Sequence, residues 1–354
     1  MRYRMGDLVE QVTEVNSDLK YGLNDIVGVT LEKQMIPTIA NLTQTNLDNF
    51  IIVHPKDFVY NPRTHGKKIG LGFNTTDRCF ISTWNNNTFR VKPEMSGVIM
   101  PEYLYMYFLR EKWDKEACFN AWGSSTVVLL WSSFCDMKIN VPSLPEQRKI
   151  VHDYQVITDR IELLRKMNET LDAIAYTCYK EMLLSEDKSK WHTGTLRELL
   201  TVKYGKDHSA LADGPFPLYG SGGLMRFVER PLYDKVSVLI PRKGSLNNIM
   251  YVDEPFWSVD TMFYTEIANP KAAKFVYFFL RDIDFLGLNT GSAVPSTSSD
   301  VIHNMQLEVP PDKDLEKFDD IVTPLFAQIK ANNNERDKLK ALRVLVSSIV
   351  TKGA

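Results

Sequence analysis

The 354-residue sequence has few cysteines, no long hydrophobic run and almost no excess of charge, with a formal net charge of −2 at pH 7. Its four cysteines, at positions 79, 118, 135 and 178, form no CxxC pair and have no histidine at ligand spacing. We therefore expect neither a zinc site nor a disulfide framework, and interpret the cysteines as core thiols. No apolar run approaches the ~18 residues that span a bilayer, and the first residues lack an apolar signal core. These absences predict a cytoplasmic protein without membrane contact.

Catalytic motifs are also absent from the sequence. No F-x-G-x-G loop follows a predicted strand and no N-P-P-Y or D-P-P-Y motif occurs, which argues against a methyl-donor site and a pocket for a flipped base. The six histidines show no triad spacing with acidic and nucleophilic residues. The run Tyr219–Gly223 resembles a phosphate-binding loop, but no Lys-Ser/Thr pair follows it, so a tight turn between strands is the better interpretation. The sequence predicts no catalytic residue, no metal site and no cofactor in this chain.

The clearest feature that is present is a long helix over residues 144–184, whose apolar residues step by four and three. Pro145 suits the first helical position, and Glu146 suits the positive end of the helix dipole. A heptad pattern of this length predicts a narrow stripe facing a partner helix. This half of the predicted helix-helix seam contains Ile150, Ile157, Ile161, Leu164, Asn168 and Leu171. Polar Asn168 would fix the register of the pair, unless it is simply a solvated residue.

A second helix of matching length is predicted over residues 311–350. Adding 168 to the numbers of Ile150, Ile157 and Ile161 gives Phe318, Leu325 and Ile329, which shows an internal repeat. The second half of the seam comprises Phe318, Leu325, Ile329 and Leu339, followed by Val346 and Val350. Pro324 predicts either a kink or a late helix start near Thr323.

The segments around the helices repeat as well. KINVPSLPEQ (138–147) resembles QLEVPPDKDL (306–315), YFLREKW (107–113) resembles FFLRDID (278–284), and NPRTHG (61–66) resembles IPRKGS (240–245). The first half has strand-like runs at 25–31, 49–55, 57–63, 79–86 and 87–93 and a helical segment at 100–113. The second half has strand-like runs at 216–225, 235–244, 249–258 and 260–267 and a helical segment at 272–282.

This pattern predicts an α+β protein made of two similar globular halves and two long helices. The composition, 44% hydrophobic and 24% charged, is that of folded globular domains, and the length exceeds what one core usually serves. The predicted domains are residues 1–143, the helix 144–186, residues 187–310, and the helix 311–354.

Basic residues gather at corresponding places in the two halves. Residues 61–92 contain six basic residues against one acidic residue, and residues 201–244 contain seven against four. Amide and hydroxyl side chains are interleaved with them, and such groups can bond to base edges and phosphates. The candidate contacts of the first half are Arg63, Thr64, His65, Lys67, Lys68, Arg78, Asn85, Asn86 and Arg90. Those of the second half are Lys206, Tyr219, Ser221, Arg226, Arg242, Lys243, Ser245 and Asn247. For any single residue, an ordinary polar loop remains an equal alternative.

The segments LPEQRKI, LYGSGGLM, VLIPRKGS and PFWSVDTMF, within the repeated plan of globular half and helix, closely resemble the specificity subunit of Type I restriction-modification systems (HsdS). The resemblance implies two target recognition domains, each reading one part of a split, asymmetric sequence in double-stranded DNA. It implies that the long helices pair antiparallel, as an intramolecular coiled coil that sets the gap and relates the halves by a pseudo-two-fold axis.

The resemblance also implies partners. Two methyltransferase subunits would dock on the helices and carry S-adenosylmethionine, and restriction subunits would use ATP and Mg²⁺, while this chain would be non-catalytic. The second helix begins PPDKDLEKF and lacks the EQ start of the first, which argues against strictly symmetric docking. The main alternative is a protein-interaction scaffold with two binding domains on a coiled coil and no nucleic acid. A fragment of a fused methyltransferase-endonuclease is disfavoured by the lack of catalytic motifs.

Overall fold

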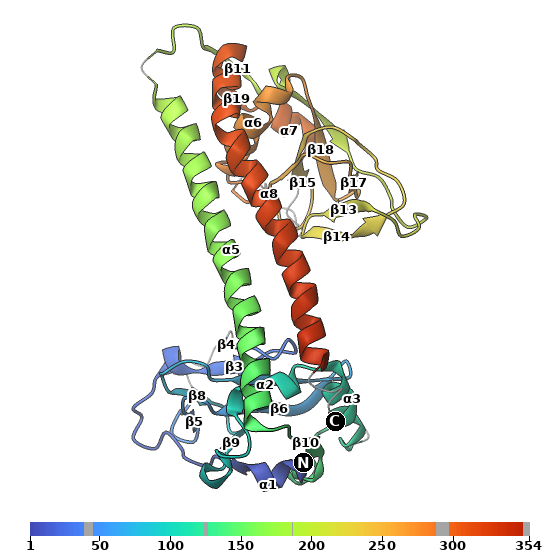
Figure 1. The fold of residues 1–354 in the computed structure, drawn as a ribbon. Helices are drawn as coiled ribbons and strands as arrows, with labels where there is room; N and C mark the ends of the chain where they lie inside the picture. Colours follow the sequence, from blue (N-terminus) through green and yellow to red (C-terminus); the bar gives the residue numbers. More distant parts are fainter. Residues whose placement is uncertain (39–44, 124–126, 186, 288–296, 350–354) are drawn as a thin grey trace. The chain divides into compact units, whose positions relative to one another are not determined.

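The structure, a computed structural model, describes residues 1–38, 45–123, 127–185, 187–287 and 297–349. Its contacts divide the chain into two compact units. Unit 1 combines Met1–Leu163 with Glu335–Ala354, and unit 2 is Leu164–Asn334. Each unit contains one globular half of the sequence and one part of each long helix (Figure 1). This division cuts across both helices, so it differs in kind from the four sequence domains, which stay a prediction.

Unit 1 is built on a four-stranded antiparallel sheet in the order β2-β9-β6-β7. The strands are β2 (Val9–Gln11), β9 (Asn87–Val91), β6 (Phe58–His65) and β7 (Lys68–Phe73). The register pairs Tyr60 with Asn87 and, further along β6, Thr64 with Ile69. Buried aromatic rings fill the core beneath the sheet, and the rings of Phe58 and Phe89 stack with centroids 4.9 Å apart.

Unit 2 contains a sheet with the same order, β12-β18-β15-β16, and the same antiparallel pairing. The strands are β12 (Leu200–Tyr204), β18 (Met262–Ile267), β15 (Ser237–Pro241) and β16 (Met250–Val252). Each unit also has a two-stranded ribbon that leads into a long helix. The ribbons are β1 (Arg2–Arg4) with β10 (Lys138–Asn140), and β11 (His192–Thr195) with β19 (Gln306–Val309). The internal repeat and the α+β class predicted from the sequence are therefore confirmed.

The remaining elements surround the repeated sheet, and four of the helices correspond in pairs: one helix follows β9 and one follows β18, and one short helix precedes β10 and one precedes β19, while the other elements differ between the units. Unit 1 adds α1 (Met5–Leu8), β3 (Val27–Val29), β4 (Met35–Pro37), β5 (Ile51–Val53), β8 (Phe80–Ser82), α2 (Pro101–Phe108), α3 (Glu111–Phe119) and α4 (Trp131–Asp136). Unit 2 adds β13 (Phe216–Gly220), β14 (Gly223–Val228), β17 (Trp257–Ser258), α6 (Ala273–Arg281) and α7 (Ser299–His303). Short 3₁₀ turns lie at Leu23–Asp25, Pro93–Met95, Leu196–Glu198 and Pro270–Ala272. The helix predicted at 100–113 is wrong in extent, because α2 ends at Phe108 and α3 begins as a separate helix at Glu111.

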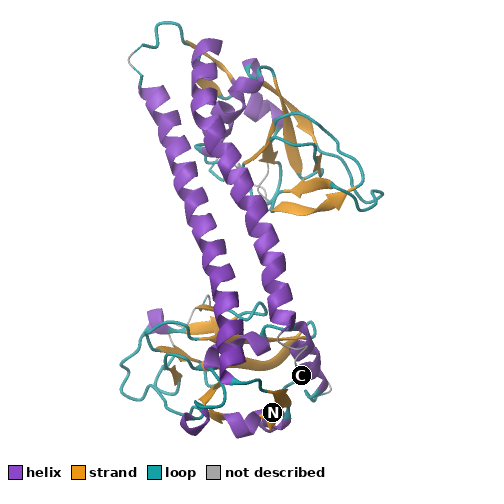
Figure 2. Cartoon of the chain, in the orientation of Figure 1, coloured by secondary structure: helices purple, strands orange, loops and turns teal. Residues whose placement is uncertain are grey.

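The helices α5 (Leu144–Leu184) and α8 (Asp312–Ile349) are the longest elements in the described part of the chain (Figure 2). The first covers the range that the sequence predicts. Of the two outcomes predicted from Pro324, the late start is wrong, since α8 begins at Asp312 with Pro324 inside it, and the kink stays a prediction. Leu315, Phe318 and Val322, which precede the proline, are buried in the core of unit 2. Their burial stabilises the first turns more than the missing proline amide weakens them.

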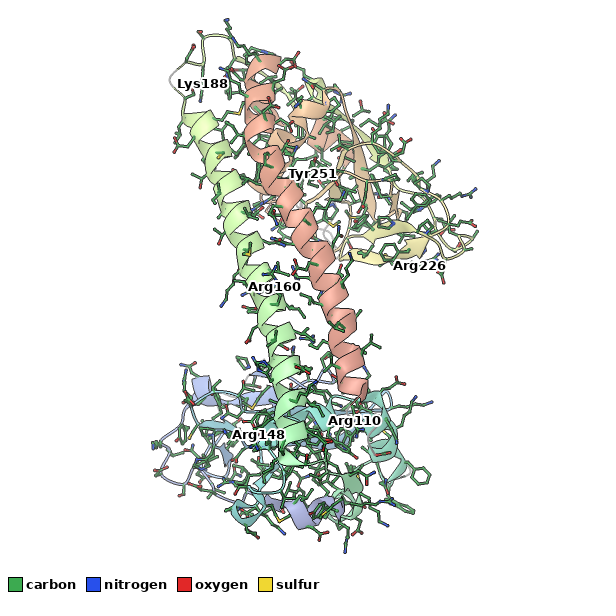
Figure 3. The ribbon with its side chains drawn as sticks, in the orientation of Figure 1. Arg110, Arg148, Arg160, Lys188, Arg226 and Tyr251 are labelled. Atoms are coloured by element: carbon green, nitrogen blue, oxygen red, sulfur yellow. The ribbon has the colours of Figure 1, made fainter. Side chains whose placement is uncertain are left out.

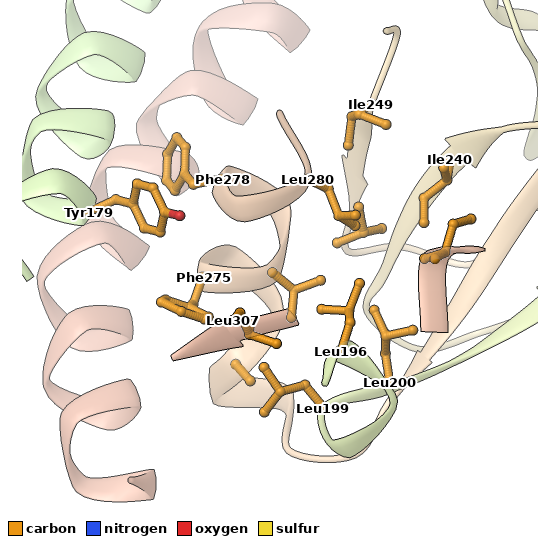
Figure 4. Close-up of a cluster of buried hydrophobic side chains, with 14 of the residues drawn as sticks. Tyr179, Leu196, Leu199, Leu200, Ile240, Ile249, Phe275, Phe278, Leu280 and Leu307 are labelled. Carbon is orange, nitrogen blue, oxygen red and sulfur yellow. The ribbon is translucent and has the colours of Figure 1, made fainter. Parts of the chain in front are cut away.

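The core of unit 2 is closed by residues of both helices. Tyr179 of α5 stacks on Phe278 of α6 with ring centroids 5.5 Å apart (Figure 4). Phe318 of α8 approaches the same pair of rings. In unit 1, Ile150 and Tyr154 of α5 and Val346 of α8 pack against the core in the same way.

The predicted seam residues are buried to different degrees. Ile157, Leu164 and Phe318 are buried. The half-buried ones are Ile150, Ile161, Asn168, Leu171, Leu325, Ile329 and Leu339. Val350, the last residue of the expected seam, lies outside the described residues.

Polar side chains meet within the part of the helix pair that belongs to unit 2. The Asn168 amide donates to Asn333 Oδ1 at 2.9 Å, and the Asn332 amide donates to Asn168 Oδ1 at 2.8 Å. Gln328 donates to Asn332 Oδ1 at 2.8 Å. Asn332 is buried at 2% exposure, so this network contains a polar group that has no access to bulk water. Asn168 is thus bonded across the pair, as a register-fixing residue would be, and is not merely solvated.

The start of α5 is fixed by two side chains of the LPEQ segment. The amide and hydroxyl of Ser143 donate to the Glu146 carboxylate at 2.9 and 2.7 Å, which caps the helix. Gln147 is fully buried and donates to the carbonyls of Val98 and Pro142 at 2.8 and 2.9 Å. Its Oε1 accepts from the Met100 amide, which precedes α2, at 2.8 Å. One side chain therefore anchors the helix to the globular part of unit 1.

The four cysteines are free and half-buried, so the prediction of core thiols was too strong. Cys135 and Cys178 pack against the two main cores from their edges. Within the described residues, no helix combines the length and hydropathy needed to cross a bilayer.

Replacing Asn332 by Ala should lower the free energy of unfolding of unit 2 by about 1–3 kcal/mol, because it strips buried partners from Asn168 and Gln328. Urea denaturation followed by circular dichroism measures the loss. Asn334→Ala is the matched control, since Asn334 is exposed two residues along the same helix, and should change stability by less than about 0.5 kcal/mol. Equal losses in the two variants would contradict the role assigned to the network.

Replacing Gln147 by Ala should destabilise unit 1 by about 1–3 kcal/mol, because the part-buried Met100 amide and the part-buried carbonyls of Val98 and Pro142 lose their partner. The neighbouring Arg148 is exposed (Figure 3), so Arg148→Ala should leave stability nearly unchanged. Thermal unfolding of the two variants compares them directly, and a Gln147→Ala protein as stable as the wild type would refute the anchoring role.

Candidate nucleic-acid interface

The sheet of unit 2 brings several loops to one of its ends. The register aligns Tyr204 with Phe263 and Phe263 with Ile240, so β12 and β15 finish where β18 begins. The segments 205–208, 242–249 and 259–261 therefore leave the sheet together. The β13–β14 turn, residues 221–222, joins them through two hydrogen bonds. Val259 N donates to Tyr219 O at 3.1 Å, and Asn248 Nδ2 donates to Ser221 O at 2.9 Å. We call these four segments the loop end of unit 2.

Seven of the eight candidates of the second half lie in or beside this loop end. They are Lys206, Tyr219, Ser221, Arg242, Lys243, Ser245 and Asn247. The tight strand turn predicted for the run Tyr219–Gly223 is confirmed, because β13 and β14 form a hairpin with Gly220 opposite Gly223.

The side chains of the loop end offer cations and hydrogen-bond donors. Lys206 and Lys243 are exposed, and neither makes an ion pair within the described residues. The Arg242 guanidinium donates to Asp260 O at 3.2 Å and lies over the Tyr204 ring, 5.4 Å from its centroid. Burial raises the pKa of Tyr219 to about 12, so its hydroxyl keeps its proton at neutral pH. This arrangement suits phosphate and base-edge contacts.

Arg226, the eighth candidate, is labelled in Figure 3 and bonds to three other residues of unit 2. Its guanidinium pairs with Asp213 at 3.0 Å and donates to the carbonyls of His208 and Leu211, both at 3.0 Å. These bonds fold the 208–213 loop against β14, so the structure gives Arg226 a structural role.

In unit 1, the β6–β7 hairpin projects a cationic tip, residues 63–68. Gly66 and Lys67 both have positive φ, 56° and 68°, as a two-residue hairpin turn requires. Arg63, Lys67 and Lys68 are exposed and make no ion pair within the described residues. Thr64 N donates to Val127 O at 3.0 Å, so a neighbouring segment supports this hairpin tip of unit 1. His65 lies exposed at the turn itself.

The other unit 1 candidates separate into two groups. Asn85 and Asn86 lie in the β8–β9 turn. Because Tyr60 of β6 pairs with Asn87 of β9, this turn leaves the sheet at the same end as the hairpin tip. Asn86 donates to Ser82 Oγ at 2.9 Å. Arg78 and Arg90 lie at the opposite end of the sheet. The first pairs with Asp25 at 3.3 Å, and the second pairs with Asp57, which is 3% exposed, at 3.1 Å.

The pair of Arg90 and Asp57 is part of the structure of unit 1. Burial raises the pKa of the Asp57 carboxyl above its ordinary value, while the His54 amide and Arg90 oppose that rise. Sequence composition does not distinguish such a paired arginine from a free one.

The hairpin tip of unit 1 and the 242–249 loop of unit 2 occupy equivalent places. The first joins β6 to β7 and the second joins β15 to β16, which are the same strands of the repeated sheet. The similar segments NPRTHG and IPRKGS mark them in the sequence. Exposed aromatic residues near these loops, Trp84, Trp122 and Tyr204, were missed, because a lone aromatic in a loop carries no sequence signal of exposure.

Within the described residues, no group of three or more His, Cys, Asp or Glu side chains is arranged to hold a metal ion. The absence of a metal site stays a prediction for the whole chain.

Replacing Arg90 by Ala should destabilise unit 1 by about 1–3 kcal/mol at neutral pH, because Asp57 would be left buried without its cation. The loss should shrink as the pH falls through the pKa of Asp57, since a protonated carboxyl does not need the cation. Arg63→Ala is the control and should change stability by less than about 0.5 kcal/mol. Urea denaturation at neutral and acidic pH measures both, and a loss that is independent of pH would argue against this pairing.

Comparison with known proteins agrees with this geometry. Residues 188–341 match the family model described as the Type I restriction modification DNA specificity domain. The chain is 24% identical over 302 residues to the Type I restriction enzyme MjaIX specificity subunit of Methanocaldococcus jannaschii, covering 73% of this chain and 69% of that protein. The crystal structure of a Type-I restriction-modification system S subunit from M. genitalium matches with a TM-score of 0.60 and 18% identity, covering 99% of this chain and 95% of that one. At this identity the structural match establishes the fold alone.

The sequence comparison and the fold lead to the same conclusion. The chain is similar to Type I restriction-modification specificity subunits in sequence and in fold, and its residues 188–341 match their DNA specificity domain.

Proposed function

We propose that this chain is the DNA-specificity subunit of a Type I restriction-modification complex, in which each unit reads one half of a split, asymmetric target in double-stranded DNA. The observation that carries the proposal is the repetition of cationic loops at equivalent strands of two equivalent sheets. A repeated fold with different loop residues is what a reader of two different half-targets needs. The match of residues 188–341 to the DNA specificity domain of such subunits supports the same conclusion.

The long helices have a mechanical role in this proposal. Their pairing sets the distance between the two reading surfaces, and therefore the gap between the half-targets, as dimer geometry sets half-site spacing in other DNA readers. Two methyltransferase subunits dock on the helices, and restriction subunits join that assembly. Those partners carry S-adenosylmethionine, ATP and Mg²⁺, while this chain supplies recognition and no catalysis.

The net charge of the chain is consistent with DNA being bound jointly by this chain and the methyltransferase subunits. The net charge of −2 gives little long-range attraction for phosphate, although the loops are locally basic. The isolated chain therefore binds DNA weakly in this proposal, and the methyltransferase subunits contribute many of the phosphate contacts. The alternative of a protein-interaction scaffold without nucleic acid has no particular observation among the described residues in its favour.

Methylation mapping tests the proposed function. The methyltransferase subunits are expressed with and without this chain, and the modified bases of the host DNA are located. With the chain present, we expect one asymmetric motif of two specified parts separated by a fixed gap. Without it, we expect no sequence-specific methylation.

A loop variant adds an internal control to the mapping. Lys243→Ala with Asn247→Ala should change or weaken only the half-target read by unit 2 and leave the other half intact. A continuous motif, or methylation that does not depend on this chain, would contradict the proposal.

A further inference from the structure

Trp122 of unit 1 is 74% exposed, and Phe119, at the end of the preceding helix α3, is 87% exposed, so two large apolar rings lie in water here. Trp122 follows α3, whose Trp113 and Ala117 are fully buried in the core of the unit. Burying an indole ring contributes strongly to stability, so a tryptophan left in water next to a well-packed helix calls for another explanation.

The backbone of Trp122 is tied to the cationic tip of the β6–β7 hairpin. Trp122 N donates to Val128 O at 3.0 Å, and Val128 N donates to Trp122 O at 2.9 Å. Val128 in turn forms a bridge with Arg63. Two successive strand-like pairings of ~4.8 Å each place the backbone of Trp122 about 10 Å from that of Arg63. This is within the width of a DNA major groove, ~12 Å.

Buried polar contacts connect the elements beneath this arrangement. Asp114 of α3 accepts from the Ile69 amide at 3.0 Å and from Lys33 Nζ at 2.6 Å, and both side chains of this ion pair are buried. Ile69 directly follows Lys68 of the hairpin tip. The helix that leads to Trp122 is therefore joined to β7, which begins at Lys68, by a buried hydrogen bond, and Asp114, the acceptor of that bond, is also paired with Lys33.

The chemistry of the surface is that of a nucleic-acid contact. Arg63, Lys67 and Lys68 are cations without ion pairs in the described part of unit 1, and they suit phosphates. A large exposed ring beside such cations suits the faces or the methyl groups of bases. A docking surface for another protein does not require an exposed ring together with three unpaired cations, whereas a DNA-binding surface uses both.

We propose that Trp122 is a specificity-determining residue whose ring packs against base pairs in the half-target read by unit 1, while Arg63, Lys67 and Lys68 hold phosphates. The proposal rests on the proposed function, because it assigns a role within DNA recognition. It predicts that changing the ring alters which bases are preferred, whereas changing the lysines alters affinity and its dependence on salt.

The test uses the full chain assembled with its methyltransferase subunits and a library of random-sequence DNA duplexes. Selected duplexes are sequenced to obtain base preferences at each position, and binding is measured against salt concentration. Trp122→Ala should lose about 10-fold of discrimination at one or more positions of the half-target of unit 1. The half-target of unit 2 is the internal control and should be unchanged, as should the salt slope.

Two further variants separate chemistry from folding. Trp122→Phe should restore most of the lost preference, because it keeps an aromatic face at the same place. The double change Lys67→Ala with Lys68→Ala should reduce the salt slope by about 2 and leave base preferences as they are. Melting temperatures show whether each variant is folded. If Trp122→Ala does not fold, the base preferences of Trp122→Phe still test the role of the ring.

Three results would overturn the assignment. Base preferences of Trp122→Ala that match the wild type in both halves would show that the ring does not read DNA. A loss of assembly with the methyltransferase subunits, with preferences intact in the complexes that remain, would show that the ring contacts protein. A wild-type complex that selects no split motif would remove the proposed function itself, and with it the basis of this role.

Discussion

The pairing of α5 with α8 is the constraint on which the rest of the structure depends. In unit 1, Ile150 of α5 and Val346 of α8 close the core of the globular part. In unit 2, Tyr179 and Phe318 do the same. Each core is therefore completed by segments that lie far apart in the sequence. The apolar contacts favour pairing at many registers, and the network of Asn168 and Asn332 selects one, since a shifted register would bury their amides without partners.

On this frame, the repeated sheets present loops at the same strand ends, and the surrounding elements make the two surfaces different. In unit 1, Trp122 and Val128 pair beside the hairpin tip. In unit 2, the β13–β14 hairpin lies beside the 242–249 loop. The shared sheet fixes where a reading surface lies, while the additions change which groups are presented there. In the proposed function, this division of roles allows one repeated fold to recognise two unlike half-targets.

The sequence predicted the helices well because heptad spacing and the Pro145–Glu146 start are local signals. It did not predict β7, since Gly70 and Gly72 weaken strand propensity. The small residue at Gly72 permits close packing, because a Cβ there would lie 3.0 Å from the Cβ of Met35 in β4 and would require that neighbour to shift. The candidate contacts show the same limit. Composition located the basic loops, but the partners of Arg90 and Arg226 come from distant parts of the chain, so only the fold separates structural arginines from available ones.

The central claim of the proposed function is that the length of the paired helices sets the gap in the DNA target, and that gap is therefore the quantity to measure. Inserting one heptad into each helix, at the level of Asn168 and Asn332, keeps the seam in register and lengthens the pair by ~10 Å. Methylation mapping of this variant should show both half-targets unchanged and a gap longer by roughly 3 base pairs. A gap of unchanged length, with both half-targets still recognised, would contradict the account.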